Sequence, residues 1–175
     1  MRSDHRGAIG ASILVMGGLL AIAGCGSDTV DAGKAEQGIE GSSLSTSTTQ
    51  ISSAACPDDV KKEKGKTFTC DVKLSGGGKA QVTVTQTSNH NTFSYAFKPG
   101  SVEIPASTVN KQLEEDLADA GVENATVNCP DPVKVKVDTT VTCPVSTANG
   151  RNGTVSFTFT SDSGSIDSSS VKESS

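Results

Sequence analysis

The sequence predicts an α+β protein of two tandem small units, each with one helix packed on a three- to four-stranded antiparallel sheet and one disulfide. The first observation is a repeat: Cys56-Pro57-Asp58 returns 73 residues later as Cys129-Pro130-Asp131. Nine of the seventeen positions in 56–72 are identical in 129–145. The other observations are short alternating apolar runs after each repeat and a clear helical pattern before the second. Together they indicate two copies of one supersecondary unit.

The first unit begins with weak signals. Lys34 to Glu40 has a weak helical pattern, with Ala35 and Ile39 on one face. The Ser- and Thr-rich segment Gly41 to Ser53 has the composition of a linker. Because the second copy has a helix in the equivalent region, we expect a poor helix followed by a loop here.

The strands of the first unit are better defined. Alternation over Thr67 to Leu74 and over Ala80 to Thr87 predicts two half-buried strands. Gly76, Gly77 and Gly78 supply the positive φ angles that a hairpin between them needs. A third strand with one bulky face is predicted through Phe93, Tyr95 and Phe97.

The second unit opens with the strongest helix of the chain, within Pro105 to Ala120. Ser107 is the expected N-cap, with Thr108 as the alternative, and Gly121 is placed to end the helix. Its apolar stripe consists of Val109, Leu113 and Leu117. The segments expected to form the sheet after it are 125–129, 140–145, 155–159 and a weaker last strand at 165–171.

The N-terminus has the pattern of an export signal. Arg2 and Arg6 precede an apolar run from Ala8 to Ala23, which is short for a membrane span. The small residues before Cys25 resemble the bacterial lipobox, in which this cysteine is acylated with lipid such as palmitate. The alternative is an ordinary secretory signal with a coincidental cysteine. We therefore expect an extracytoplasmic protein held at the cell membrane by lipid on Cys25.

These patterns divide the chain into four parts. Residues 1–24 form the lipoprotein signal peptide and 25–33 a tether. Residues 34–100 form the first repeat unit and 101–175 the second.

With Cys25 lipidated, four cysteines remain, and they allow three disulfide pairings. If the two copies fold alike, the pairs are Cys56 with Cys70 and Cys129 with Cys143. Zinc and redox sites prefer C-x-x-C spacing, which neither copy has. We therefore expect structural disulfides, no metal site and no cofactor.

Composition and single residues argue against several functions. The formal net charge is −5, which argues against nucleic acid as a partner. His90 lies in an Asn-flanked turn without an accompanying nucleophile, so a solvated role is expected. Asp58 and Asp131 are expected to cap the turns that follow them rather than to act as a catalytic pair. The glycines at 76–78 lack phosphate-loop spacing, and 61–66 is expected to be a solvated, mobile loop face.

The cysteine blocks resemble a known family. Val127-Asn128-Cys129-Pro130 and the segment Gly65 to Cys70 are similar to the pattern of actinobacterial, mycobacterial-type envelope lipoproteins with "domain of unknown function 4333". Ala54 and Asp138 depart from that pattern, where the family has valine and glycine. The resemblance implies a helix followed by a valine-rich sheet in each of two tandem copies, and it carries over no catalytic residue.

The expected function is therefore a lipid-anchored, non-enzymatic cell-envelope lipoprotein. Its two disulfide-stapled units would be binding or interaction modules for an envelope protein or a small molecule, neither identified. The alternative is an extracytoplasmic enzyme inhibitor of the plan of the β-lactamase inhibitory protein. Such an interface would need aromatic anchors, for which Phe93, Tyr95 and Phe97 are the candidates.

Overall fold

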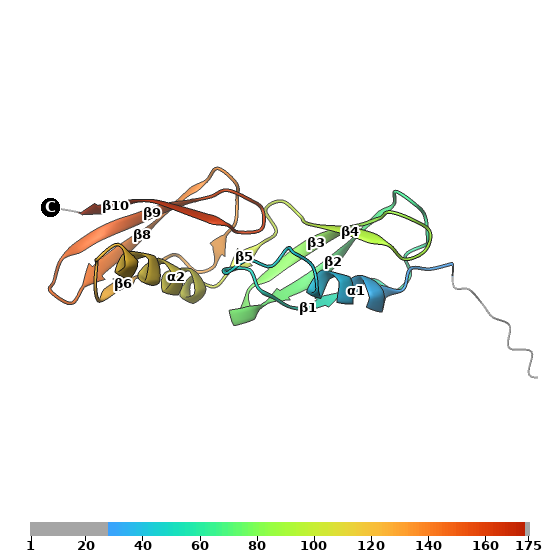
Figure 1. The fold of residues 1–175 in the computed structure, drawn as a ribbon, viewed down its shortest axis with the longest axis horizontal. Helices are drawn as coiled ribbons and strands as arrows, with labels where there is room; N and C mark the ends of the chain where they lie inside the picture. The colour runs from blue at the N-terminus through green and yellow to red at the C-terminus, as the bar shows by residue number, and fades with distance from the viewer. Residues whose placement is uncertain (1–27, 174–175) are drawn as a thin grey trace, which may run out of the picture.

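The structure, a computed structural model, describes residues 28–173, and side chains up to 166. Two helices, α1 (Ala32–Glu40) and α2 (Ala106–Asp119), and a short 3₁₀ turn, η1 (Ser75–Gly77), accompany the strands (Figure 1). The strands are β1 (Ile51–Ala55), β2 (Thr67–Leu74), β3 (Lys79–Gln86), β4 (Phe93–Phe97), β5 (Glu103–Ile104), β6 (Ala125–Val127), β7 (Val133–Lys134), β8 (Thr140–Thr147), β9 (Asn152–Phe159) and β10 (Ile166–Glu173).

The two units have matching topology and lie end to end (Figure 1). In the first, β1, β2, β3 and β4 pair in that order beside α1; in the second, β6, β8, β9 and β10 pair in that order beside α2. The short strands β5 and β7 extend the first sheet beyond β3. All named strand pairs are antiparallel. The predicted α+β class, with one helix, one sheet and one disulfide in each unit, is confirmed.

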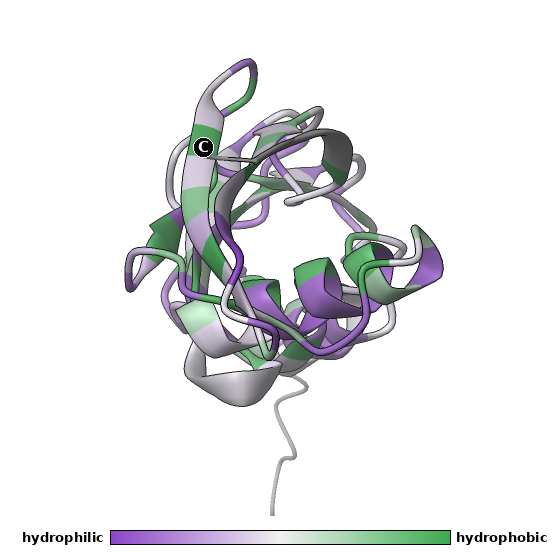
Figure 2. Cartoon of the chain, turned by 90° about the vertical axis from the view of Figure 1, so that its left-hand side faces the viewer, coloured by the Kyte–Doolittle hydropathy of each residue, from purple (hydrophilic) through white to green (hydrophobic). Residues whose placement is uncertain are grey.

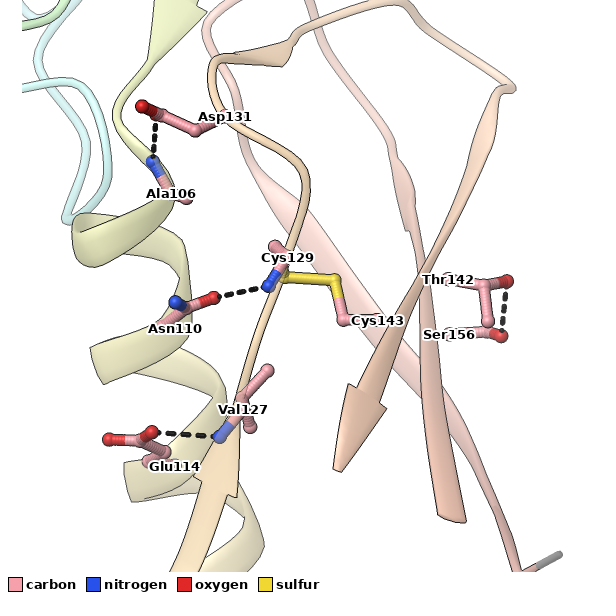
Figure 3. The surroundings of a disulfide bond; sticks show 9 residues. All are labelled: Ala106, Asn110, Glu114, Val127, Cys129, Asp131, Thr142, Cys143 and Ser156. Carbon is pink, nitrogen blue, oxygen red and sulfur yellow. Dashed lines mark hydrogen bonds between the residues drawn. A yellow bond between two sulfur atoms is a disulfide. The ribbon is translucent and has the colours of Figure 1, made fainter. Parts of the chain in front are cut away.

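In both units the helix uses two polar side chains to cover the edge strand. In the first, Glu36 and Glu40 accept hydrogen bonds from the backbone N–H groups of Cys56 and Ala54, at 2.9 and 3.2 Å. In the second, the acceptors are Asn110 and Glu114, and the donors are the backbone N–H groups of Cys129 and Val127, both at 2.9 Å (Figure 3). Residues four apart share one helix face, so each helix satisfies outward-pointing donors of a strand edge that would otherwise be open.

The ends of α2 differ in part from the sequence prediction. Its N-cap is Pro105, which provides no side-chain cap, so the expected caps Ser107 and Thr108 are wrong. The acceptor at this end is Asp131, whose carboxylate takes the Ala106 N–H at 2.9 Å (Figure 3). A carboxylate there is favourable because the helix N-terminus carries partial positive charge. The C-terminus ends as expected at Gly121, which has φ of 87°.

The Ser- and Thr-rich segment is not a plain linker. Residues 51–55 form β1, which pairs with β2, and the loop before it reaches the second unit. There the Thr48 and Thr49 hydroxyls donate to the backbone carbonyls of Gly164 and Ser163, at 2.8 and 2.6 Å. Both threonines are buried. Composition alone did not predict this contact, because the hydrogen-bond acceptors of the two hydroxyls lie in a turn more than a hundred residues away.

The glycine-rich turn after β2 packs closely against the second unit. A Cβ on Gly78 would lie 2.7 Å from the Glu103 carbonyl oxygen, and one on Gly76 would lie 2.9 Å from the Thr108 hydroxyl. In the equivalent turn of the second unit, the positions of Gly76 and Gly78 are occupied by Asn149 and Arg151, which both have side chains. The glycine run therefore permits backbone contact between units, in addition to forming a hairpin.

The apolar residues of both units form one continuous core. Its members come from α1, α2 and the inner faces of both sheets, and the largest fully buried side chains include Phe157, Phe159, Ile39 and Leu113. In the end-on view the two helices lie on the same side of the molecule, and curved strands surround the rest (Figure 2). The segment from Asp28, at the end of the predicted tether, lies against the loop after Cys56, where the Val30 N–H donates to the Val60 carbonyl at 2.7 Å.

We predict that Gly78→Ala destabilises the protein by about 1–3 kcal/mol, because the new methyl group meets backbone that cannot move away cheaply. Gly78 has ordinary extended angles, so the effect is steric. Urea unfolding of the disulfide-bonded protein measures it. Gly33→Ala is the control: it is helical, its nearest new contact is 3.5 Å, and its stability should not fall. Equal stability of the two variants would contradict the packed junction.

Candidate ligand-binding groove

Each unit holds one disulfide, in the predicted pairing. Cys56 bonds Cys70 with Cα atoms 4.4 Å apart, and Cys129 bonds Cys143 with Cα atoms 4.6 Å apart (Figure 3). Cys70 and Cys143 are fully buried. Each bridge ties the end of an edge strand to the adjacent strand and contributes roughly 3 kcal/mol by the loop-closure estimate. The disulfides thus serve as staples beneath the outer face of the sheet.

A row of polar side chains crosses the outer face of the first sheet. The register places Ser53, Lys73, Lys79, Glu103 and Lys134 opposite one another in turn across β1, β2, β3, β5 and β7. Their inward neighbours along β2 and β3 are buried, so alternation directs this row to solvent. Three lysines and one glutamate make the row cationic in an acidic protein.

A second row lies beside the first and closes a groove of about 560 Å³. Ala55, Asp71 and Gln81 occupy successive strands, and Gly100 and Ser101 form the rim beyond β3. The side-chain amide of Gln81 donates to the Asp71 carboxylate at 3.0 Å, and the Ser101 hydroxyl donates to the backbone carbonyl of Gln81 at 3.1 Å. These bonds hold one wall of the groove in place.

An ion-pair network closes the end of the groove at the unit junction. Glu103 binds the ammonium groups of Lys79 at 3.1 Å and Lys134 at 3.7 Å. The hydrogen bond from Lys79 lowers the pKa of the Glu103 carboxyl below its ordinary value, and the charges of both lysines add to this while burial opposes it. One carboxylate is thus shared by two cations that come from different units.

The other predicted polar residues do not gather at this groove. His90 is exposed in a turn, and its backbone N–H donates to the Ser88 hydroxyl at 3.0 Å. Asp131 binds the start of α2, whereas Asp58 is exposed in a turn of the first unit. The side chains of the 61–66 loop are mostly exposed, but its backbone is held by Gln86, which is buried.

The aromatic side chains of β4 are used within the first unit. Tyr95 lies so close to α1 that a Cβ on Gly38 would be 1.8 Å from its hydroxyl oxygen. Partial burial raises the pKa of the Tyr95 phenol. Phe93 packs edge-on against Phe68 at 6.2 Å, and Phe97 is buried. These rings are engaged in packing, so they do not favour the alternative of an inhibitor with aromatic anchors.

Some predicted features lie outside the described residues, namely the signal peptide 1–24 and the acylation site Cys25. Between residues 28 and 173 no helix is long and apolar enough to cross a membrane. The same part of the chain contains no cluster of three or more His, Cys, Asp or Glu residues suited to a metal ion.

Comparison with known proteins identifies the repeat. A family model described as "Domain of unknown function (DUF4333)" matches the chain twice, at residues 14–90 and 93–164. The chain belongs to this family. The two DUF4333 matches correspond to the two units seen in the fold, each with its own disulfide. Searches of the curated proteins and of the solved structures found no match.

The Glu103 network predicts a pH dependence of stability. Since the folded-state pKa is lowered, the network's contribution is present above the ordinary value of 4.5 and is lost as the pH falls through the lowered pKa. Wild type should therefore be more stable than Glu103→Gln near neutral pH, and this difference should shrink in acid. Urea midpoints between pH 7 and about pH 3 measure it.

Glu115→Gln is the control, because the ion pair of Glu115 is with Lys111, at 3.8 Å on an exposed helix surface. Its effect at neutral pH should be smaller, as for exposed pairs in general. A wild-type advantage over Glu103→Gln that stays constant down to pH 3 would contradict the network.

Proposed function

We propose that this DUF4333 protein is a lipid-anchored cell-envelope lipoprotein, not an enzyme, that binds a small ligand in the groove of its first unit. The groove is the observation that carries the proposal. Its volume of about 560 Å³ falls within the range of small-molecule sites, roughly 300–1,000 Å³. Its floor is a disulfide-stapled sheet, which suits binding because a rigid floor loses little entropy when a ligand arrives.

The chemistry of the lining residues supports binding rather than catalysis. The Ser101 hydroxyl donates to the backbone carbonyls of Lys98 and Gln81, so its proton is used in structure. Asp71 accepts from Gln81, and Glu103 is held by two lysines. A nucleophile needs a neighbouring base, and these groups are engaged with other partners.

The N-terminal sequence supports anchoring. Ala23 and Gly24 precede Cys25, and only two residues separate Cys25 from Asp28, where the described fold begins. Acyl chains on Cys25 would therefore keep the first unit close to the membrane surface. The two disulfides support an extracytoplasmic location, because such bonds persist in oxidising compartments.

We predict that protein expressed from the full chain in a bacterial host has a diacylglyceryl-modified Cys25 as its first residue. Mass spectrometry of the N-terminal peptide and detergent partitioning measure this. Cys25→Ala should release the protein from the membrane fraction with its fold unchanged. An unmodified, soluble wild-type protein would rule out the anchor.

We predict that Ala55→Trp removes ligand binding by filling the groove. Ala55 is exposed, so the indole can lie over the groove without entering the core. Protein incubated with the small-molecule fraction of an envelope extract and then gel-filtered should retain a ligand, detected by native mass spectrometry. The control is Asn128→Trp, at the equivalent exposed position of the second unit, which should retain the ligand. Retention by neither wild type nor control, or equally by all three proteins, would refute groove binding.

A further inference from the structure

We propose that the groove binds the phosphate group of its ligand between the ammonium groups of Lys73 and Lys79. This assignment rests on the proposed binding function and names the chemical class of the ligand. A phosphate monoester carries a charge of about −1.5 to −2 near pH 7, which two lysines match. Lysine binds phosphate as a point charge and does not need the planar fork of arginine.

The two lysines are held together by the sheet register. Lys73 on β2 and Lys79 on β3 are directly opposite each other on the outer face. Such pairs have Cβ atoms about 4.5–5.5 Å apart, so both ammonium groups can reach one phosphate. Ser53 lies opposite Lys73 on β1 and brings a hydroxyl donor to the same row. The register thus places these three side chains next to one another among the residues that line the groove.

The positive charge of this pair is only partly neutralised by its neighbours. Like charges directly opposite each other on a sheet are unfavourable. Glu103 is shared between Lys79 and Lys134, at 3.1 and 3.7 Å. Lys73 makes no side-chain hydrogen bond or ion pair within the described residues. An oxyanion between Lys73 and Lys79 would relieve the repulsion.

Asp71 limits what the groove accepts. It lies two residues before Lys73 on the same strand face, about 6–7 Å away by strand geometry, and accepts the Gln81 amide. Its charge disfavours a second anionic group on that side. The geometry therefore fits a ligand with one phosphate end and a neutral or cationic remainder.

The second unit shows that the fold does not require these lysines. Its equivalent row, with the same register across β6, β8 and β9, is Thr126, Ser146 and Asn152. The positions of Lys73 and Lys79 are thus occupied by Ser146 and Asn152, two neutral residues, in a unit of matching topology. The two positive charges are therefore specific to the first unit. The residues at the same positions of the second unit can replace the lysines without a change of fold.

The test measures the phosphate affinity of the Cys25→Ala protein, which has no acyl chains of its own to insert into a vesicle. Isothermal titration calorimetry with glycerol 3-phosphate gives the affinity for a soluble monoester, and co-sedimentation with vesicles that contain phosphatidic acid gives the affinity for a lipid monoester. Lys73→Ser with Lys79→Asn installs the residues of the second unit. This variant should fold and bind at least about tenfold more weakly, as loss of a charge-assisted hydrogen bond implies. Lys73→Ser alone should weaken binding in the same direction, and Asp71→Asn should strengthen it.

A matched control distinguishes the effect of losing the two groove lysines from the effect of a lower net charge. Lys111→Ser with Lys136→Asn removes the same charge from exposed positions outside the groove and should keep wild-type affinity. Binding of glycerol 3-phosphate assigns a soluble phosphate ester, whereas binding of vesicles alone assigns a lipid headgroup. Equal losses in both double variants would overturn the site.

The outcomes also separate this inference from the proposed function. If wild type retains an envelope ligand but binds neither phosphate probe, the phosphate assignment is wrong while groove binding stands. If it retains no ligand and binds neither probe, both fail.

Discussion

Each unit depends on one arrangement: an edge strand stapled to its neighbour by a disulfide and covered on its open side by helix side chains. Cys56 and Cys129 are the centre of it, since each forms the disulfide and also donates its backbone N–H to a helix side chain. The disulfide fixes one side of the strand and the helix fixes the other. Without the helix side chains, the backbone groups of this edge strand would be unpaired and could pair with another chain and aggregate. The disulfide adds stability that a small core with few aromatic residues does not supply alone.

The junction between the units is formed by backbone pairing, close packing at glycines and side-chain hydrogen bonds. β5 pairs with β3 of the first unit and with β7 of the second, so the backbone is continuous from one sheet into elements of the other unit. Glycines at 76–78 permit the close approach, and Thr48 and Thr49 close the other side with hydroxyl bonds. The groove ends at this junction, where Glu103 holds one lysine from each unit. The second unit therefore helps to shape the site of the first.

The repeat made the disulfide pairing predictable, because two copies of one fold must pair their cysteines alike. Local periodicity of apolar residues made helix α2 and the strands β2, β3, β8 and β9 predictable. Strand β1 was not predictable, since the residues of 51–55 acquire their structure from pairing with β2. The cap at α2 was missed because Asp131 is distant in sequence from Ala106. No motif marks the groove. Lys73 and Lys79 flank a hairpin, and a register assigned from that hairpin would have revealed the facing pair, but not its neighbours Ser53 and Glu103 on other strands.

We infer that only the first unit binds a phosphate ligand, because its row contains Lys73 and Lys79 where the second unit has Ser146 and Asn152. Amide chemical shifts of the isotope-labelled protein, recorded during titration with glycerol 3-phosphate, test it most directly because both rows are read in one sample. The account predicts saturable shifts centred on Ser53, Lys73 and Lys79, with Thr126, Ser146 and Asn152 unchanged. Shifts of equal size in both rows, or shifts centred on the second unit, would contradict it.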